Sequence, residues 1–269
     1  GGAFWMGEAG DDDALLHRLA GLGRDYWIAQ TPVSVAQFRQ FVTESGYQKH
    51  SAESLQNVEN RPVTEVSWYD AQAFCRWLTE RWQNQLPAGW SVALPSEAEW
   101  EKAARGGEQL PVRLQMTTVA QGFALVASEL CENPFPQRAY PWGEDFATDH
   151  ANAEVDVGST SAAGCFQLGR SPYDCEDMAG NVWEWTRSLW GSDIFKPEFG
   201  YPYDPDDGKR EALDAGNDVM RVVRGGSWSF PRFNARCAYR DGFVPGSRYY
   251  FIGFRVVLRS SHVLLTLLL

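Results

Sequence analysis

Glycine and proline interrupt this chain at short intervals, and large aromatic residues fill the stretches between them. The 269 residues include 25 Gly and 14 Pro beside 12 Trp, 15 Phe and 10 Tyr. Gly and Pro favour turns, whereas aromatic rings supply large packing contacts. We therefore expect a folded chain with a real core, few long helices or strands, and much irregular backbone.

Three segments are predicted to be helical. Residues 33–45 and 67–85 place apolar side chains three and four positions apart, which is the spacing of one helix face. Residues 94–107 carry helix boundaries of their own, because Ser96 and Glu99 match a capping box in which each side chain binds a free backbone amide. This last helix is the best-defined element of the sequence.

Regular structure is expected to be sparse beyond these helices. Gly106 is predicted to stop the third helix in a left-handed conformation. Residues 108–152 lack sustained periodicity and are expected to run over the surface, with no chemistry that can be assigned to them. Near the C-terminus, three runs resemble strands: residues 221–224, 235–240 and 252–258.

The charge and the cysteine pattern exclude several classes of function. A net charge of −11 and an isoelectric point near 4.9 would repel nucleic acids and anionic membranes, so neither is an expected partner. The 5 cysteines have no C-x-x-C spacing and no H-E-x-x-H occurs, so neither a zinc site nor a complete disulfide framework is predicted. Buried free thiols are expected instead.

The sequence shows no signal-peptide pattern and no membrane span. Its apolar tail, residues 263–269, is far shorter than the roughly 20 residues that a spanning helix requires. We expect a soluble monomer as the chain is given. Because the chain begins without Met, we also expect a piece of a longer protein, and surface display through a missing N-terminal segment stays open.

Seven short motifs occur in order along almost the whole chain. They are Gly2–Gly7, Pro62–Trp68, Leu94–Gly107, Trp142–Gly143, Gly180–Trp185, Arg224–Trp228 and Gly253–Arg255. Together they resemble the formylglycine-generating-enzyme (sulfatase-modifying factor) superfamily. The resemblance implies a single α+β domain over residues 1–269, with a C-type-lectin-like fold of the formylglycine-generating-enzyme type and much irregular backbone.

The metal ligands of the catalytic branches are missing from this sequence. Members that oxidise a substrate cysteine hold copper(I) with two Cys five residues apart, because soft thiolates suit that ion. The matching positions are Phe230 and Ala235, and Cys237 alone does not replace a pair. Members that join sulfur to histidine derivatives use an iron site built mostly by an upstream helical domain, which this chain does not contain. We therefore expect no redox cofactor and no enzyme.

The chain is most similar to another branch, the variable proteins of diversity-generating retroelements. In these proteins, mutation at template adenines rewrites a C-terminal segment, which corresponds to residues 221–255 here. Fixed frame residues are Arg224–Trp228, Arg236–Arg240, Pro245, Arg248 and Ile252–Arg255. The fifteen predicted variable residues between them are Ser229, Phe230, Pro231, Arg232, Phe233, Asn234, Asp241, Gly242, Phe243, Val244, Gly246, Ser247, Tyr249, Tyr250 and Phe251.

The composition of these fifteen positions agrees with that resemblance. Adenine changes in an AAY codon never produce Lys, Glu, Gln, Met or Trp, and none of the five occurs there. Six positions are aromatic, although loops normally carry small polar turn formers. Rigid rings give large contact area at low entropic cost, as in antibody paratopes. The expected hot spots are Phe230, Phe233, Tyr249 and Tyr250.

An alternative is that these rings complete the core beneath the loops, since large aromatic side chains are often buried. On the display interpretation, only the frame residues Trp228, Tyr239 and Phe254 belong to the core. The resemblance also implies a structural Ca²⁺ site. Its ligands would be the carboxylates of Asp177 and Glu184 and the carbonyls of Gly180 and Val182, hard oxygens of the kind that Ca²⁺ takes.

Two further alternatives concern charged residues. Asp177 and Glu184 could cap turns or pair with Arg instead of binding calcium. Four arginines could form an anion site, but in a strand-rich core such residues more often pair with Asp or Glu, which we favour. They are Arg224, Arg236, Arg240 and Arg255.

These observations favour a ligand-binding display protein, the variable protein of a diversity-generating retroelement, whose partner is an unidentified protein or other macromolecule. Two alternatives remain: a sulfatase-modifying-factor-like oxidase with an unrecognised site, and a regulatory domain of a larger protein with one fixed partner.

Overall fold

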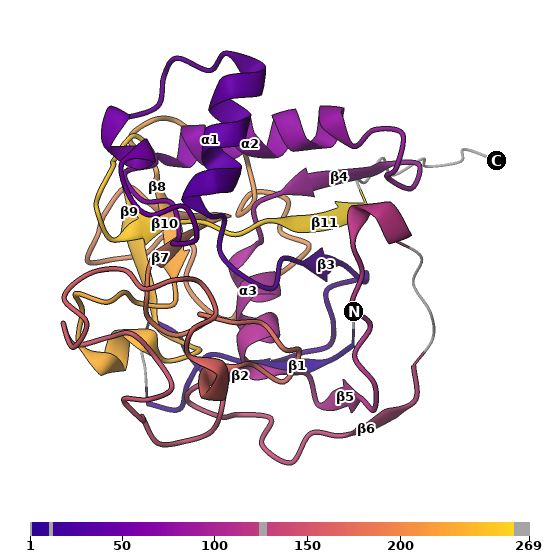
Figure 1. The fold of residues 1–269 in the computed structure, drawn as a ribbon. Helices are drawn as coiled ribbons and strands as arrows, with labels where there is room; N and C mark the ends of the chain where they lie inside the picture. Colours follow the sequence, from indigo (N-terminus) through magenta and orange to yellow (C-terminus); the bar gives the residue numbers. More distant parts are fainter. Residues whose placement is uncertain (1, 11–12, 124–127, 261–269) are drawn as a thin grey trace.

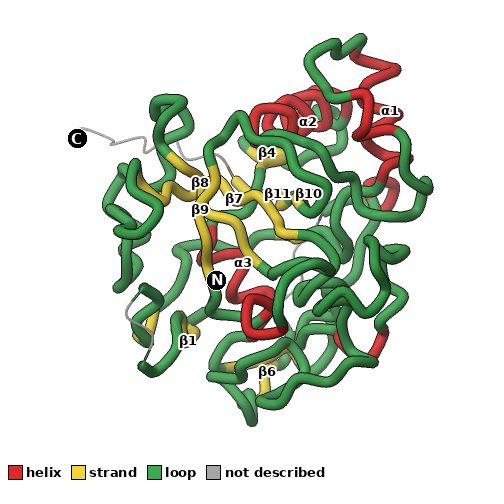
Figure 2. Tube along the Cα trace, turned by 90° about the vertical axis from the view of Figure 1, so that its left-hand side faces the viewer, coloured by secondary structure: helices red, strands yellow, loops and turns green. Residues whose placement is uncertain are grey.

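Irregular backbone connects short strands and a few helices throughout the protein (Figure 2). The computed structural model describes residues 2–10, 13–123 and 128–260, so the apolar tail at residues 263–269 lies outside the described residues. The predicted α+β character and the predicted predominance of loops are confirmed.

The three predicted helices are present, and each begins at a serine that forms a capping box. They are α1 (Val35–Ser45), α2 (Trp68–Arg81) and α3 (Glu97–Arg105). The second helix was predicted to continue to residue 85, but it ends at Arg81 because the chain turns at Trp82. Gly106 does end α3 at a positive φ of 91°, but its ψ of 162° is extended, so the predicted left-handed stop is wrong in detail. Four short 3-10 helices complete the set: η1 (Ala52–Leu55), η2 (Val119–Gln121), η3 (Gln167–Gly169) and η4 (Arg232–Ala235).

The largest sheet has four strands in the order β10-β7-β8-β9. Its strands are β7 (Trp183–Gly191), β8 (Met220–Arg224), β9 (Arg240–Phe243) and β10 (Ile252–Gly253). β10 runs parallel to β7, and the other neighbours are antiparallel. Every residue of β7 is buried, so this strand is the centre on which the rest of the fold packs.

The remaining strands form a second sheet and two hairpins. The second sheet has the order β3-β11-β4. Its strands are β3 (Trp27–Ile28), β4 (Trp90–Ala93) and β11 (Val257–Ser260). The hairpins pair β1 (Phe4–Met6) with β2 (His17–Leu19), and β5 (Gln109–Pro111) with β6 (Leu130–Glu132). Figure 1 shows α1 and α2 on one side of the strands and α3 beside β1 and β2.

Of the three predicted C-terminal strands, only residues 221–224 are confirmed, within β8. Residues 236–239 instead form a turn between η4, which ends at Ala235, and β9, which begins at Arg240. In this turn, the carbonyls of Cys237 and Ala238 accept hydrogen bonds from the Arg224 guanidinium rather than from a neighbouring strand. Residues 252–258 divide between two sheets, since β10 pairs with β7 and β11 pairs with β3 and β4. The predicted single strands at these two places are therefore wrong.

A core of aromatic rings joins the helices to the large sheet. Phe38 of α1 stacks on Phe74 of α2 with 6.3 Å between ring centroids, and Phe254 meets both rings edge-on. Trp183 and Trp185 lie two residues apart on β7 and are fully buried. Since alternate strand residues share a face, both indoles lie on the same side of β7, where they contact rings of the segment from Phe230 to Phe243.

Candidate ligand-binding surface

The segment from Trp228 to Phe251 gathers its aromatic rings into a layer that we call the aromatic surface. This segment is yellow-orange on the left of Figure 1, around η4, β9 and β10. The eight rings are Trp228, Phe230, Phe233, Tyr239, Phe243, Tyr249, Tyr250 and Phe251. Each lies within hydrophobic contact distance of another ring of the set.

Phe251 is the hub of the aromatic surface. Its ring stacks on Tyr249 at 5.1 Å between centroids and 3° between planes, and it meets Phe230 and Tyr250 edge-on at 5.0 and 5.1 Å. Such offset and edge-on contacts stabilise aromatic pairs beyond their area burial. The rings therefore brace one another instead of moving independently in a loop.

The aromatic surface rests on the two buried indoles of β7. Phe230 meets Trp183 edge-on at 5.7 Å, and Phe243 meets Trp185 edge-on at 6.5 Å. Tyr239 lies 6.0 Å from Trp183, which joins it and its neighbour Phe233 to the rest of the layer. The core of the fold thus supports the inner side of the layer.

The outer side of the aromatic surface faces solvent. Tyr250 is 54% exposed, Phe233 49% and Tyr249 39%. The other rings are half-buried, so none of the six predicted variable aromatics is sealed in the interior. Trp228 and Tyr239, which we predicted to be core, are half-buried members of the surface, and only Phe254 is fully buried as predicted.

Thirteen of the fifteen predicted variable residues are at least partly accessible, and two are not. Asn234 is 4% exposed and lies in η4, where it packs beneath the layer. Gly242 is buried in β9 against the indole of Trp190. Placing these two residues on a ligand-facing surface was therefore wrong, because strand pairing and helix packing turn them inward.

Buried ion pairs fasten the frame around the aromatic surface, as predicted for the arginines. Arg255 binds Glu184 at 2.6 Å, and Arg224 binds Glu101 at 2.5 Å, with all four side chains inaccessible to solvent. Arg240 forms a third buried pair with Glu97 at 2.9 Å. Arg236 pairs with Glu8 at 2.7 Å, but these two side chains are partly exposed. Because one partner of each pair lies far away in sequence, these contacts hold the variable segment against the body of the fold.

A fifth arginine ties the last loop to α2. Arg248 donates to both carboxylate oxygens of the fully buried Asp70, whose side chain also completes the capping box of α2 with Ser67. Tyr47 donates to the same carboxylate at 2.7 Å. The backbone carbonyl of Tyr249 accepts from the amide of Glu65 at 3.0 Å. The loop that carries the most exposed tyrosines therefore has fixed ends.

The positions at which the resemblance places copper ligands carry no donor atoms. Phe230 belongs to the aromatic surface, and Ala235 is 1% exposed in η4. Cys237 nearby is fully buried, and burial raises the pKa of its thiol to about 12. Since the thiolate is the form that binds metals and attacks substrates, Cys237 is not set up for either role.

The proposed calcium ligands have other partners in the structure. Both carboxylate oxygens of Glu184 accept from Arg255, and one also accepts from the Trp100 indole at 2.7 Å. Glu184 therefore fits the ion-pair alternative, and its role as a calcium ligand stays a prediction. The Asp177 carboxylate is nearly buried and accepts from the amide of Gly164 at 2.9 Å, and burial raises its pKa to about 6. Calcium binding through Asp177, Gly180 and Val182 stays a prediction.

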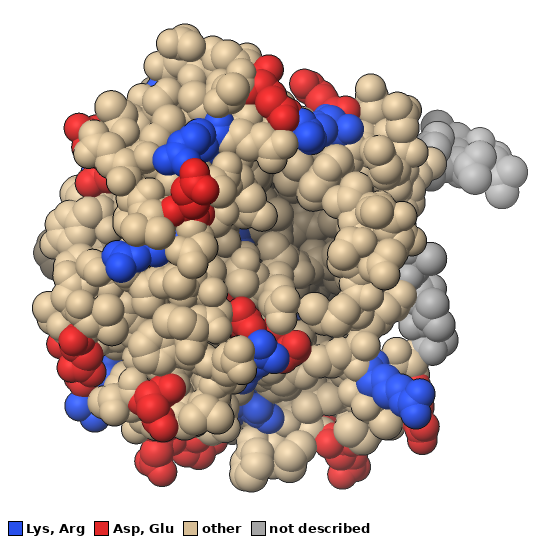
Figure 3. Space-filling view, viewed as in Figure 1, with Lys and Arg blue, Asp and Glu red and all other residues tan. Residues whose placement is uncertain are grey.

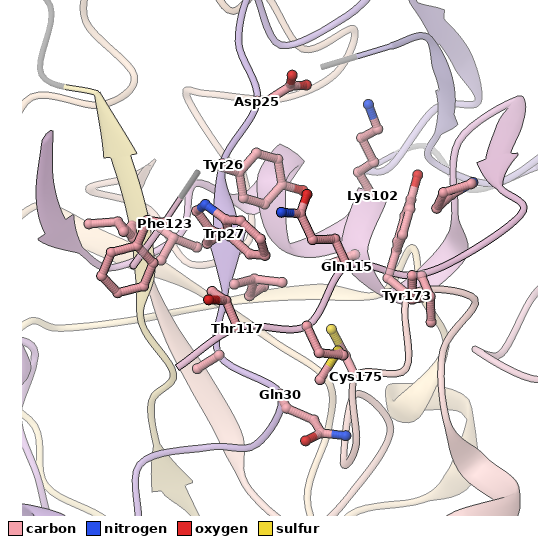
Figure 4. A pocket seen from close by; sticks show the side chains of 18 of the residues that line it. Asp25, Tyr26, Trp27, Gln30, Lys102, Gln115, Thr117, Phe123, Tyr173 and Cys175 are labelled. Atoms are coloured by element: carbon pink, nitrogen blue, oxygen red, sulfur yellow. The ribbon is translucent and has the colours of Figure 1, made fainter. Parts of the chain in front are cut away.

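A deep cavity opens on another part of the molecule, where the sequence indicated no chemistry. Its volume is about 1120 Å³, and it is hollowed into the face shown in Figure 3. Its wall includes side chains from residues 108–123 and 128–130, together with residues of β3, β11 and α3. Figure 4 shows Trp27 and Phe123 on one side and Lys102 and Tyr173 on the other.

Within the described residues, no three His, Cys, Asp or Glu side chains come together as a metal site. In that same part of the chain, no helix is long and apolar enough to cross a membrane.

A model of the sulfatase-modifying factor enzyme 1-like domain matches residues 1–260. The chain belongs to this sulfatase-modifying factor family. Serine/threonine-protein kinase pkn1 of Chlamydia pneumoniae is 30% identical over 80% of this chain, which corresponds to 25% of the kinase. The formylglycine-generating enzyme of Mus musculus is 30% identical over 75% of this chain and 45% of its own length. The chain therefore spans a quarter to about half of these relatives.

A further curated protein and two solved structures are also similar to this chain. The inactive C-alpha-formylglycine-generating enzyme 2 of Bos taurus is 28% identical over 72% of this chain and 49% of its own length. PvdO from Pseudomonas aeruginosa shares the fold with a TM-score of 0.67 and 23% identity, covering 96% of this chain and 91% of PvdO. Treponema denticola variable protein 1 has a TM-score of 0.64 and 20% identity, covering 95% and 91%. These likenesses confirm the predicted fold.

The reactivity of the five free cysteines tests whether any buried thiol is reactive in the native protein. Cys131 and Cys165 are exposed, whereas Cys75, Cys175 and Cys237 are buried and burial raises the pKa of each thiol. We expect a thiol reagent such as Ellman's reagent to label two cysteines in the native protein at pH 8 and all five in guanidinium. A third fast thiol in the native state would contradict the assignment of Cys237 as inert.

Proposed function

We propose that this member of the sulfatase-modifying factor family is a ligand-binding display protein, the variable protein of a diversity-generating retroelement. The observation that carries the proposal is the aromatic surface. Its half-buried rings rest on two buried tryptophans, its outer rings are exposed, and buried ion pairs hold the surrounding frame. Exposed aromatic patches on soluble proteins commonly mark interaction sites.

The physical division between frame and surface suits diversification. The frame side chains that hold the segment, Arg224, Arg240 and Arg255, are buried and paired. The exposed rings of Tyr249 and Tyr250 make their ring contacts with half-buried members of the aromatic surface, such as Phe251, so replacing one exposed ring leaves the ion pairs intact. A surface that can change while its support stays constant is what a display protein requires.

The oxidase alternative lacks support at its own site. Phe230 and Ala235 stand where the copper-binding cysteines of the oxidising members would be. A relative whose name describes it as inactive shows that membership of the family does not by itself imply activity. Titration with copper(I) and a thiol oxidation assay are expected to show neither tight binding nor turnover, and copper-dependent oxidation would overturn the proposal.

The display role is tested by randomising the thirteen accessible positions with AAY-derived residues while the frame is kept constant. We expect most library members to remain folded on a yeast surface, and selection against purified lysozyme to yield binders. In such a binder, replacing an aromatic residue selected at position 249 or 250 with Ala should weaken binding at least tenfold, because central aromatic residues dominate interface energies.

The matched control for this experiment is Phe195→Ala, since Phe195 is 91% exposed but lies outside the aromatic surface. It should leave the affinity unchanged. A library that is mostly unfolded, or binders whose affinity depends on Phe195 and not on positions 249 and 250, would count against the proposal.

One observation favours a second candidate, a regulatory domain with a fixed partner. The matched region occupies only a quarter of the chlamydial kinases. The DNA that flanks the gene separates the two candidates. A nearby copy of the sequence coding residues 221–255, altered at adenines and accompanied by a reverse transcriptase gene, selects the display protein, and its absence selects the fixed-partner domain.

A further inference from the structure

We propose that the deep cavity between β3, β11 and the described residues 108–123 and 128–130 is a second ligand site, which takes an uncharged small molecule built around an aromatic ring system. The cavity measures about 1120 Å³. Sites for small organic ligands are usually concave, largely apolar and about 300–1,000 Å³ in volume. The space is therefore large enough to enclose such a molecule.

Three aromatic side chains from separate parts of the chain form one wall of this cavity. The ring of Phe123 lies 6.4 Å from Trp27 and 6.3 Å from Trp82, tilted against both. All three line the open space. A flat ring inserted beside them would gain the same edge-on and offset contacts that the wall residues make with each other.

The wall also contains a polar group whose hydrogen bond is not made. The indole nitrogen of Trp27 is covered and has no hydrogen-bond partner among the described residues. A buried donor without a partner costs roughly 1–3 kcal/mol. A ligand that carries an acceptor near this wall would relieve that cost after a small rotation of the indole.

The charged groups around the cavity have partners within the protein. Arg18 binds Glu108 through two hydrogen bonds of 2.5 and 2.7 Å. Lys102 donates to the carbonyl of Gly2 and lies over the ring of Phe4. Asp25 interacts electrostatically with Lys102. Two cations and two anions leave no net charge to attract an ion, so an uncharged ligand fits best.

The opposite wall supplies a few polar contacts that can orient the ligand. Tyr173 lies on this side in Figure 4, Gln30 lies at the lower end of the cavity, and Thr117 lies near Trp27. Tyr173 accepts from the amide of Gly107 and Gln30 donates to the carbonyl of Asp174, so both side chains are held in place. A mostly apolar space with few fixed polar groups is typical of small-molecule sites.

The experiment uses two fluorescent probes of nearly the same shape. N-phenyl-1-naphthylamine is uncharged, and 8-anilino-1-naphthalenesulfonate adds one negative charge. We expect the full chain to bind the uncharged probe with rising fluorescence and at least tenfold more tightly than the anionic probe. Tighter binding of the sulfonate would overturn the assignment to uncharged ligands, because Lys102 would then be acting as an anion partner.

Variants distinguish the cavity from the aromatic surface, which could also attract a dye. Val256 lines the cavity and is half-buried, so Val256→Trp should fill it and weaken probe binding at least tenfold. Thr117→Trp fills it from the opposite loop and serves if circular dichroism shows Val256→Trp to be unfolded. Tyr250→Ala, on the aromatic surface, should leave probe binding unchanged.

The opposite pattern of probe binding would contradict the cavity proposal. If Tyr250→Ala abolishes probe binding and both cavity-filling variants keep it, the dye binds the aromatic surface and the cavity is not a ligand site. Because the two sites share no residue, this outcome leaves the display proposal intact.

Discussion

Glu184→Gln is expected to destabilise the protein by about 3–5 kcal/mol, the usual cost of removing one partner from a buried ion pair. Glu184 accepts from Arg255 at 2.6 and 2.7 Å and from Trp100 at 2.7 Å, and neither charged side chain is exposed. Glutamine keeps the shape but replaces one accepting oxygen by a donating amide. The Arg255 guanidinium would then remain charged and buried without the carboxylate that binds it directly.

Unfolding in urea, followed by tryptophan fluorescence, measures this loss. The matched control is Glu59→Gln, which removes the charge from a pair with Arg39 in which the Glu59 side chain is 72% exposed. That variant should leave the unfolding midpoint almost unchanged, because solvent-exposed pairs contribute little. A similar small effect at Glu184 would show that the pair is not what holds the frame.

The same variant also separates the ion pair from the calcium alternative. If Glu184 serves Arg255, adding calcium or a chelator should not change the difference between the wild type and Glu184→Gln. If calcium stabilises the wild type and not the variant, Glu184 is a calcium ligand and the ion-pair explanation is wrong. A ligand that binds only the folded state raises its stability by mass action, so the readout is direct.

Local sequence signals predicted the helices well because their determinants lie within a few residues. The capping box of Ser96 and Glu99 forms as predicted, and the serines that begin α1 and α2 act in the same way. The frame arginines were also predictable in kind, because a charged group in a strand-rich core requires a partner. The identity of each carboxylate partner was not predictable, because the partners of Arg224 and Arg240 lie more than a hundred residues away in the sequence.

The errors arose where distant contacts override a local pattern. Residues 235–240 have the composition of a strand, yet residues 236–239 form a turn in which Arg224 binds the carbonyls of Cys237 and Ala238. Trp228 is a frame residue that we predicted to be core, but it is half-buried beside Tyr250 in the aromatic surface. The cavity gave no sequence signal, because its wall combines residues from β3, α3 and β11 with a segment that has no periodicity.

The extent of the variable surface can be tested at two of its predicted glycines, Gly242 in β9 and Gly246 in the turn that follows. Gly242→Ala is expected to destabilise the fold by about 1–3 kcal/mol or more, the range for overpacked cores. A β-carbon at this position would lie 2.5 Å from the nearest atom of the Trp190 indole, which no real structure tolerates. That indole cannot easily move, since it is 4% exposed, donates to the Asp193 carbonyl and lies under the Arg240 guanidinium.

Gly246→Ala is the matched control, because no atom lies within 4 Å of the position that its β-carbon would occupy. Alanine there should be neutral, or stabilising by up to about 1 kcal/mol through its smaller unfolded-state entropy. Urea unfolding of the two variants measures the difference. If both variants are equally stable, position 242 can vary and belongs to the diversified positions after all. If only Gly246→Ala is tolerated, diversification is confined to positions that the buried frame leaves open, and copies of the gene should keep glycine at 242 while position 246 varies.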